Sequence, residues 1–243
     1  MIFLEGRMNI MMYGYYYDPT YILVLIAAFL CIAAQMHVNS TYKKYARVTS
    51  RSGMTGAETA RRILQMSGIY DVRIEHVRGN LTDHYDPKNK VLRLSDTVYG
   101  SYSVAAIGVA AHECGHAVQH DKGYAPLSFR TTLAPVASIG SWVGIPLVFL
   151  GIFFGMNQTL IQVGIWVFSL AVLFQLVTLP VEFNASGRAL AMLGDYRLLD
   201  QDETRLCRKV LTAAALTYVA AAATAVLQLL RLILLSGGGR RRD

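Results

Sequence analysis

The chain has 243 residues, which allow one domain, or one domain with a membrane part. Hydrophobic residues make up 53% of the chain, a share too high for an ordinary soluble enzyme. The formal net charge is +7, but no basic stripe interleaved with aromatic residues occurs, so a nucleic-acid partner is not expected.

The first predicted element is a membrane anchor. Residues 21–36 form an apolar run that is long enough, with its flanks, to cross a bilayer, and basic residues follow it at positions 43–51. A tyrosine cluster at residues 13–21 suits a headgroup boundary, whereas a signal peptide needs a basic start and a small-residue cleavage site. We therefore predict an uncleaved anchor within an N-terminal segment of residues 1–38.

Residues 39–130 are expected to form a compact α/β part. A capping-box pattern followed by a glycine stop predicts a helix near residues 56–67. Alternating apolar residues at 72–74 and 92–94 predict two short strands. Residues 79–87 lie between them and are rich in turn formers, so they are predicted to be a polar loop or an edge strand.

An HExxH motif at residues 112–116 lies inside a helix predicted for residues 104–119, with Ser101 or Ser103 as its cap. His112 and His116 are one turn apart on one helical face, so both imidazoles can converge on one Zn²⁺ ion at about 2.0 to 2.1 Å. Glu113 then faces a water on the metal and can act as the base in peptide-bond hydrolysis. The motif predicts a hydrolytic zinc site.

The cysteines are predicted to have no role in metal binding or in disulfides. Cys114 lies about 200° around the helix from His112, so it is expected to face the core. Cys31 and Cys207 have no paired spacing, which fits a reducing compartment. Small residues give the motif helix a face for close contact with another element: Gly108, Ala111 and Gly115.

A membrane hairpin is predicted for residues 131–181. Two apolar runs, 133–154 and 160–181, each supply about the 20 residues that a spanning helix needs, and a short neutral turn joins them. Small residues along the first run would let the two helices approach closely. They are Ala134, Ala137, Gly140, Gly144 and Gly151.

A catalytic zinc ion needs a third protein ligand, and Glu182 is the first candidate. Pro180 belongs to a helix-start signal, which predicts that Glu182 leads a separate helix within residues 182–210. Small residues that follow Glu182 would let this helix pack near Gly115. Alternatively, Glu182 only complements the helix dipole.

Two further histidines are weighed for the site. His120 is the rival third ligand, but three ligands along one straight helix cannot close a tetrahedral site. His84, beside Asp83 and Asp86, either lines a substrate groove and stabilises an oxyanion or is only a solvated turn residue.

The last apolar stretch, residues 211–235, either crosses the membrane or packs over the preceding domain or the interface. Most Lys and Arg residues near span ends lie in residues 39–130 and 182–209, which predicts that this side is cytoplasmic. A fourth span would place the basic tail, residues 240–242, on the opposite side. We therefore expect three or four transmembrane helices, with residues 211–243 as an apolar helix and basic tail.

Along almost its whole length the chain resembles the YugP-like membrane-bound neutral zinc metallopeptidases. The resemblance is carried by LTDHYDP at residues 81–87, VAAIGVAAHECGH at 104–116 and LPVEFNAS at 179–186. Shorter similar stretches lie at residues 18–23, 52–58, 123–127 and 216–219.

The resemblance implies a gluzincin-like membrane protease, related in plan to the HtpX and CaaX prenyl protease group. Its zincin-like catalytic part would hold zinc through His112, His116 and Glu182, with Glu113 as the base. Such proteins usually carry an aspartate four residues after the third ligand, where this chain has Ser186, which can accept an imidazole hydrogen bond without adding charge. Tyr218 joins His84 as a candidate for stabilising the oxyanion.

The sequence as a whole predicts an α+β membrane protein in the plasma membrane, with its active site on the cytoplasmic side. Its expected activity is zinc-dependent hydrolysis of peptide bonds in membrane or membrane-associated proteins, with the substrate extended along residues 81–87. Its expected partners are the lipid bilayer and a peptide or protein substrate. The alternative is a catalytically silent, zinc-dependent membrane scaffold, and a metal transporter is less supported because ionisable pairs are scarce in the spans.

Overall fold

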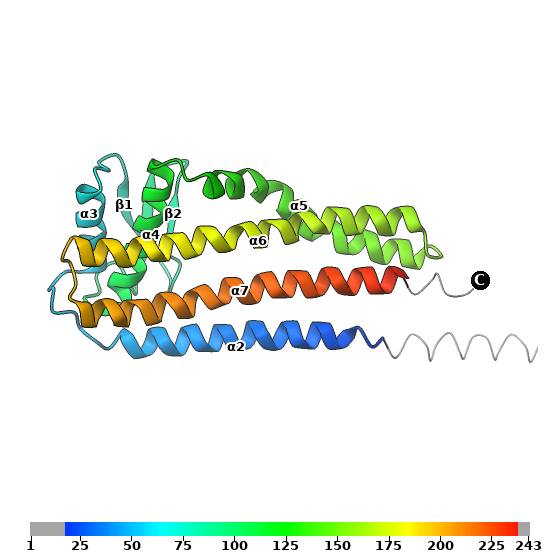
Figure 1. Ribbon diagram of the computed structural model, residues 1–243, viewed down its shortest axis with the longest axis horizontal. Coiled ribbons are helices and arrows are strands. Elements are labelled where there is room, and N and C mark those ends of the chain that lie inside the picture. The colour runs from blue at the N-terminus through cyan, green and yellow to red at the C-terminus, as the bar shows by residue number, and fades with distance from the viewer. Residues whose placement is uncertain (1–17, 238–243) are drawn as a thin grey trace, which may run out of the picture.

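The computed structural model describes residues 18–237. Four long helices run along its longest axis, and a small α/β part sits at one end (Figure 1). The long helices are α2 (Tyr21–Tyr45), α5 (Ala125–Phe153), α6 (Gln158–Asp195) and α7 (Gln201–Gly237). The tyrosines before residue 18 and the predicted basic tail lie outside the described residues.

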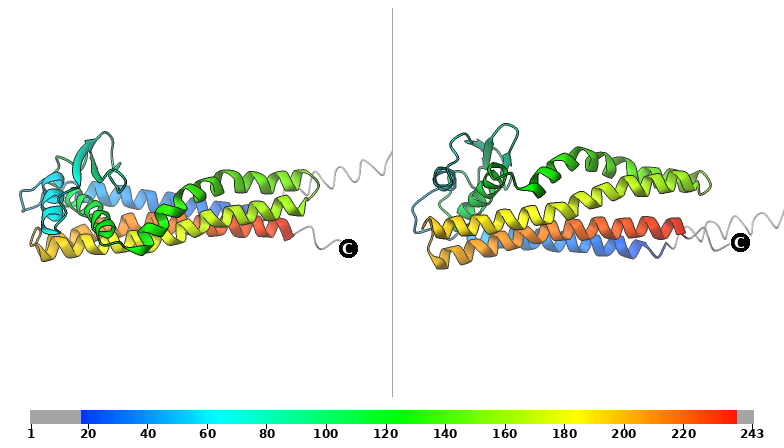
Figure 2. Two further views of the ribbon diagram at one scale, coloured as in Figure 1. Left: turned by 90° about the horizontal axis from the view of Figure 1, so that it is seen from above. Right: turned by 45° about the horizontal axis from the view of Figure 1, so that its top comes forward.

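The four long helices are long and apolar enough to cross a membrane. The start of α2, the turn between α5 and α6, and the end of α7 all lie at the end of the molecule opposite the α/β part (Figures 1 and 2). The predicted hairpin is present, and residues 211–235 lie within α7, one of the four candidate spans. Close approach of α5 to α6 is confirmed at Gly140 and Gly144, where an added Cβ would lie within 2.6 and 2.8 Å of atoms of α6.

The α/β part contains α3 (Gly56–Met66), α4 (Val104–Asp121) and a three-stranded sheet. The strands β1 (Arg73–Val77), β2 (His84–Asp86) and β3 (Val91–Ser95) have the order β1-β3-β2, with β1 parallel and β2 antiparallel to β3. The two predicted strands are therefore confirmed. The segment at residues 79–87, predicted as a loop or an edge strand, is a loop up to residue 83 and then forms the edge strand β2. The cap of α3 is also confirmed, because Thr55 and Glu58 form a reciprocal capping box.

The helix that carries the HExxH motif is α4, and Ser103 caps it by accepting a hydrogen bond from the Ala106 N–H. Its predicted core-facing cysteine is confirmed: Cys114 is fully buried, and its thiol contacts the Ala60 carbonyl at 3.6 Å. Burial raises the pKa of the Cys114 thiol well above its usual value. Cys207 is also buried and packs against Gly108, so both cysteine side chains belong to the hydrophobic core.

The prediction of a separate helix beginning near Glu182 is wrong. Helix α6 continues for 38 residues from the second arm of the hairpin to Asp195, and Pro180 lies inside it. Proline removes one backbone donor, but long membrane helices tolerate this where side chains and neighbouring helices compensate. Thr178 is buried before the proline, and Val181, Glu182 and Ala185 are buried beyond it. Packing on both sides of Pro180 keeps the helix continuous, so the predicted boundary between residues 181 and 182 falls inside it.

A buried ion pair joins α7 to the start of α2. Arg231 is only 6% exposed, and its guanidinium donates to Asp18 at 3.2 Å and to Thr20 at 3.3 Å and stacks on the Tyr21 ring. A cation in an apolar run is costly unless it is paired, and here its hydrogen-bonding partners come from the residues just before α2. This pairing explains how α7 accommodates an arginine near the end of the apolar stretch.

The predicted close contact of Gly115 with the helix that carries Glu182 is confirmed. A Cβ built on Gly115 would lie 2.5 Å from the Ala185 carbonyl oxygen, so α4 and α6 touch through their backbones.

We expect Gly115→Ala to reduce the free energy of unfolding by about 1–3 kcal/mol, because the two helices must separate. Urea unfolding in detergent, followed by circular dichroism, measures this loss.

Gly187 is the matched control, because it lies on α6, is exposed and has no atom within 4 Å of a built Cβ. Gly187→Ala should leave stability unchanged or raise it by about 0.5–1 kcal/mol through its better helix propensity. Equal effects of the two substitutions would show that the backbone contact does not limit packing.

Candidate metal centre

Three side chains from two helices converge at the junction of α4 and α6. The carboxylate Oε2 of Glu182 lies 3.2 Å from His112 Nε2 and 3.5 Å from His116 Nε2. One donor atom from each residue lies within 4.8 Å of the others, which is the arrangement of a candidate metal-binding group. The side chain of Glu182 is only 3% exposed, so it approaches the imidazoles from the protein interior.

Hydrogen bonds on the far side of each imidazole orient the two rings. Gln119 donates its Nε2 to the Val181 carbonyl and to Asn184, so its Oε1 accepts from His116 Nδ1 at 3.0 Å. In a neutral His116 ring, the Nε2 atom then carries a lone pair and no hydrogen. A lone pair that faces a carboxylate is unfavourable without a cation between them, so this donor set fits a divalent metal ion.

His112 has the corresponding partner in Ser186, whose hydroxyl lies 3.1 Å from His112 Nδ1. This is the position where the family resemblance leads one to expect an aspartate. Ser186 keeps the hydrogen bond that orients an imidazole, but it brings no negative charge to the ring.

Arg130, like Gln119, is a site residue that sequence reasoning missed. Its guanidinium lies 3.0 Å from Glu182 Oε1, the oxygen that does not face the imidazoles. Arg130 therefore binds one oxygen of the Glu182 carboxylate, and the other oxygen faces the two histidines. Its only sequence signal was a basic residue near the start of an apolar run, which the positive-inside tendency explains equally well.

The electrostatics of the cluster favour a positive charge. Burial alone would lower the pKa of His116, but the carboxylates of Glu182 and Glu113 outweigh it and hold that pKa above its usual value. Glu113 is 8% exposed and follows His112 on α4.

His120 does not join the cluster. It is exposed, and its Nδ1 bonds to the Tyr85 hydroxyl at 2.9 Å. Burial, helped by nearby aspartates, raises the pKa of Tyr85 to about 12, so the hydroxyl keeps its proton and can donate to that nitrogen. The contact ties the end of α4 to the edge strand β2.

Almost the whole described chain matches a known family. A family model described as "Putative neutral zinc metallopeptidase" matches residues 20–237, which include every residue of the cluster. The chain belongs to this family. A relative from Bacillus subtilis (strain 168), described as "Putative membrane protease YugP", is 52% identical over 202 residues, which cover 83% of this chain and 89% of that protein. No solved structure matches the chain.

In this member of the neutral zinc metallopeptidase family, a cavity of about 360 Å³ opens beside the cluster, between β2, α4, α5 and α6. His116, Glu182, Glu113 and Arg130 line one side of it. The predicted residues His84 and Tyr218 line it as well, although they come from the edge strand and from α7. His84 is exposed, and its ring contacts the Thr82 carbonyl and Arg93.

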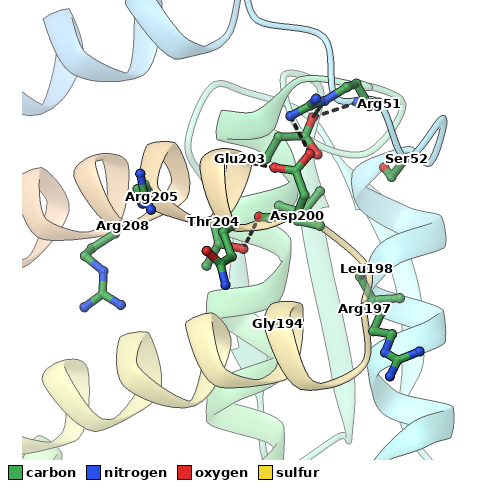
Figure 3. Close-up of a pocket in the computed structure, with 12 residues that line it drawn as sticks. Arg51, Ser52, Gly194, Arg197, Leu198, Asp200, Glu203, Thr204, Arg205 and Arg208 are labelled. Carbon is green, nitrogen blue, oxygen red and sulfur yellow. Dashed lines mark hydrogen bonds and ion pairs between the residues drawn. The ribbon is translucent and has the colours of Figure 1, made fainter.

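A larger cavity of about 820 Å³ lies at the connection between α6 and α7 and contains none of the cluster residues. Figure 3 shows that Arg51 reaches from the α2–α3 connection to Asp200 and Glu203 at the start of α7. The buried Glu203 accepts the Arg51 backbone N–H at 2.7 Å. These contacts join the α2–α3 connection to the α6–α7 connection at the end of the molecule farthest from the hairpin turn. The cavity is not part of the candidate metal centre.

Proposed function

We propose that this chain is a membrane-embedded zinc metalloendopeptidase whose zincin-like catalytic part is built from residues 39–130 together with α6. The observation that carries the proposal is the convergence of His112 Nε2, His116 Nε2 and Glu182 Oε2, with Glu113 between the two histidines of an HExxH motif. Membership of the neutral zinc metallopeptidase family supports it. A structural metal site would need only ligands, and Glu113 adds a proton acceptor.

The proposed mechanism assigns one role to each side chain. His112, His116 and Glu182 would hold the zinc ion, which supplies Lewis acidity that polarises the scissile carbonyl and acidifies a water molecule. Glu113 takes the proton of the attacking water and delivers it to the leaving nitrogen. Arg130 orients Glu182 through its second oxygen.

The proposed substrate lies at the membrane boundary. Glu182 is about 36 Å along α6 from the start of that helix, and the hydrocarbon core of a bilayer is about 30 Å thick. The centre would therefore lie just outside the bilayer, on the side of the basic segments, which we propose to be the cytoplasmic side of the plasma membrane. One edge of β2 has no partner strand among residues 18–237, so an extended peptide can add to it beside the cavity.

Tyr218 is proposed to stabilise the oxyanion. It lines the cavity together with Glu113 and Arg130, although it lies far from both in the sequence. We expect Tyr218→Phe to lower kcat by about tenfold or more with little change in KM, because a transition-state hydrogen bond is lost. His84→Ala is the companion variant, since His84 faces the same cavity. Unchanged turnover in both variants would remove these residues from the mechanism.

The proposal is tested with purified protein in detergent and casein as the substrate. We expect about one zinc ion per chain, casein cleavage that 1,10-phenanthroline abolishes, and recovery of cleavage when zinc is added back. The isomer 1,7-phenanthroline, which does not chelate, is the matched control. Preparations that contain no zinc, or that cleave casein equally with and without the chelator, would refute the proposal.

A further inference from the structure

A second cavity, which we call the α2–α7 cavity, lies on the other side of Glu113. It measures about 240 Å³, is partly open to the surface, and is lined by α2, α4, α7 and the loop before β2. Asp83, Glu113 and Tyr218 line both this cavity and the 360 Å³ cavity, so the two spaces meet at the proposed base. A peptide whose scissile bond lies at Glu113 therefore has room on both sides of that bond.

The polar groups of the α2–α7 cavity are satisfied within the protein, apart from those at its catalytic end. The Tyr42 hydroxyl donates to the Thr97 carbonyl, and the Thr217 hydroxyl donates to the Ala214 carbonyl. Both carboxylate oxygens of Asp83 accept hydrogen bonds from Ser95, and burial raises the pKa of this carboxyl. Tyr42, Thr217 and Asp83 therefore have little capacity left for a polar ligand. Gln35 donates to Asn39, and its side chain is exposed to solvent.

The remaining wall is apolar. It consists of Val38, Leu81, Val109, Val210, Leu211 and Ala214. Leu81 has a φ of 55°, a left-handed conformation that is costly for leucine, and its side chain still lines this cavity. No lysine or arginine contributes to the lining. An acidic side chain would meet Glu113 without a counter-charge. A basic side chain would pair with Glu113 and occupy the carboxylate that the proposed mechanism needs as its proton acceptor.

Size and position restrict the occupant further. Pockets for drug-sized ligands measure about 300–1,000 Å³, so a cavity of 240 Å³ suits a single large side chain. Val38 lies about 26 Å from the start of α2, and Ala214 lies about 35 Å from the end of α7. Both positions are at the edge of a bilayer core of about 30 Å, where apolar residues adjoin a membrane segment.

We propose that the α2–α7 cavity is a specificity subsite that takes one large apolar side chain, such as Leu, Ile, Phe or Met, next to the scissile bond. This subsite rests on the proposed function and deepens it, because the endopeptidase would then select substrates with an apolar residue at one position next to the scissile bond.

The test maps cleavage sites in denatured casein by mass spectrometry. We expect the wild-type protein to cleave next to large apolar residues at one fixed position relative to the bond. Ala214→Trp fills the cavity from α7, and Val38→Trp fills it from α2. Each should lower cleavage at large apolar residues by about tenfold or more relative to cleavage at glycine and alanine.

Leu216→Trp is the matched control, because Leu216 lies two residues from Ala214 on α7 but is 44% exposed and does not line the cavity. It should leave the cleavage pattern unchanged, and zinc content should be equal in all four proteins. Cleavage without a residue preference, or a preference that neither cavity variant changes, would overturn the subsite while the proposed function stands. Failure of the wild-type protein to cleave any casein site would overturn both.

Discussion

Glu113→Gln should lower kcat for casein hydrolysis by about 10²- to 10⁴-fold, because the proton acceptor is lost while the shape of the side chain is kept. Zinc content and melting temperature should stay close to the wild-type values, since Glu113 is not among the proposed ligands. Steady-state hydrolysis and metal analysis of the same preparation measure the two effects separately.

Glu75→Gln is a suitable control for this variant. Glu75 is a partly exposed glutamate on β1, the strand farthest from β2 in the sheet. Its loss should not change turnover. If Glu113→Gln kept wild-type turnover and wild-type cellular phenotypes, the catalytically silent scaffold would become the better account of this chain.

Glu182→Gln should weaken zinc binding by more than about 100-fold, which exceeds the effect expected from losing a hydrogen-bonding partner of a ligand. Glutamine can still accept the Arg130 hydrogen bond, so the change mainly removes the charged ligand. Zinc at about 100 times its Kd stabilises a protein by about 2.7 kcal/mol. That zinc-dependent gain should disappear in the variant, and competition titrations and melting curves with and without zinc measure both effects.

Two comparisons show whether the loss is specific to the ligand. Ser186→Ala removes only the hydroxyl beside His112 Nδ1, so it should weaken zinc binding by a smaller factor of about 10–100. Glu203→Gln alters another buried glutamate, at the remote α6–α7 connection, and should leave zinc binding unchanged. Similar zinc affinities in the Glu182 and Glu203 variants would exclude Glu182 as a ligand.

Local patterns predicted the elements of the α/β part well. Three of these patterns act within a few residues and can therefore be recognised in the sequence. They are the capping box at Thr55, the alternation around Ile74 and Leu92, and the serine cap of α4. The same holds for the relation between His112 and His116, because one helical turn separates them in any α-helix.

Other features depended on contacts between distant segments. Pro180 resembles a helix start in the sequence, yet packing beyond it keeps α6 continuous, because buried contacts at Val181 and Ala185 outweigh the lost backbone donor. Arg130 lies 52 positions from Glu182, and no local pattern relates them. The same is true of Gln119, which orients His116 only because it is anchored to Val181 and Asn184 on another helix.

The sequence by itself determined the apolar runs, the small sheet, and the placing of two imidazoles and a carboxylate on one turn of α4, because these follow from short-range periodicity. Only the tertiary structure decided which carboxylate reaches the imidazoles, which arginine holds it, and that two cavities meet at Glu113. Those relations arise where α2, α4, α5, α6 and α7 pack together, and packing depends on the whole buried surface rather than on any one stretch of sequence.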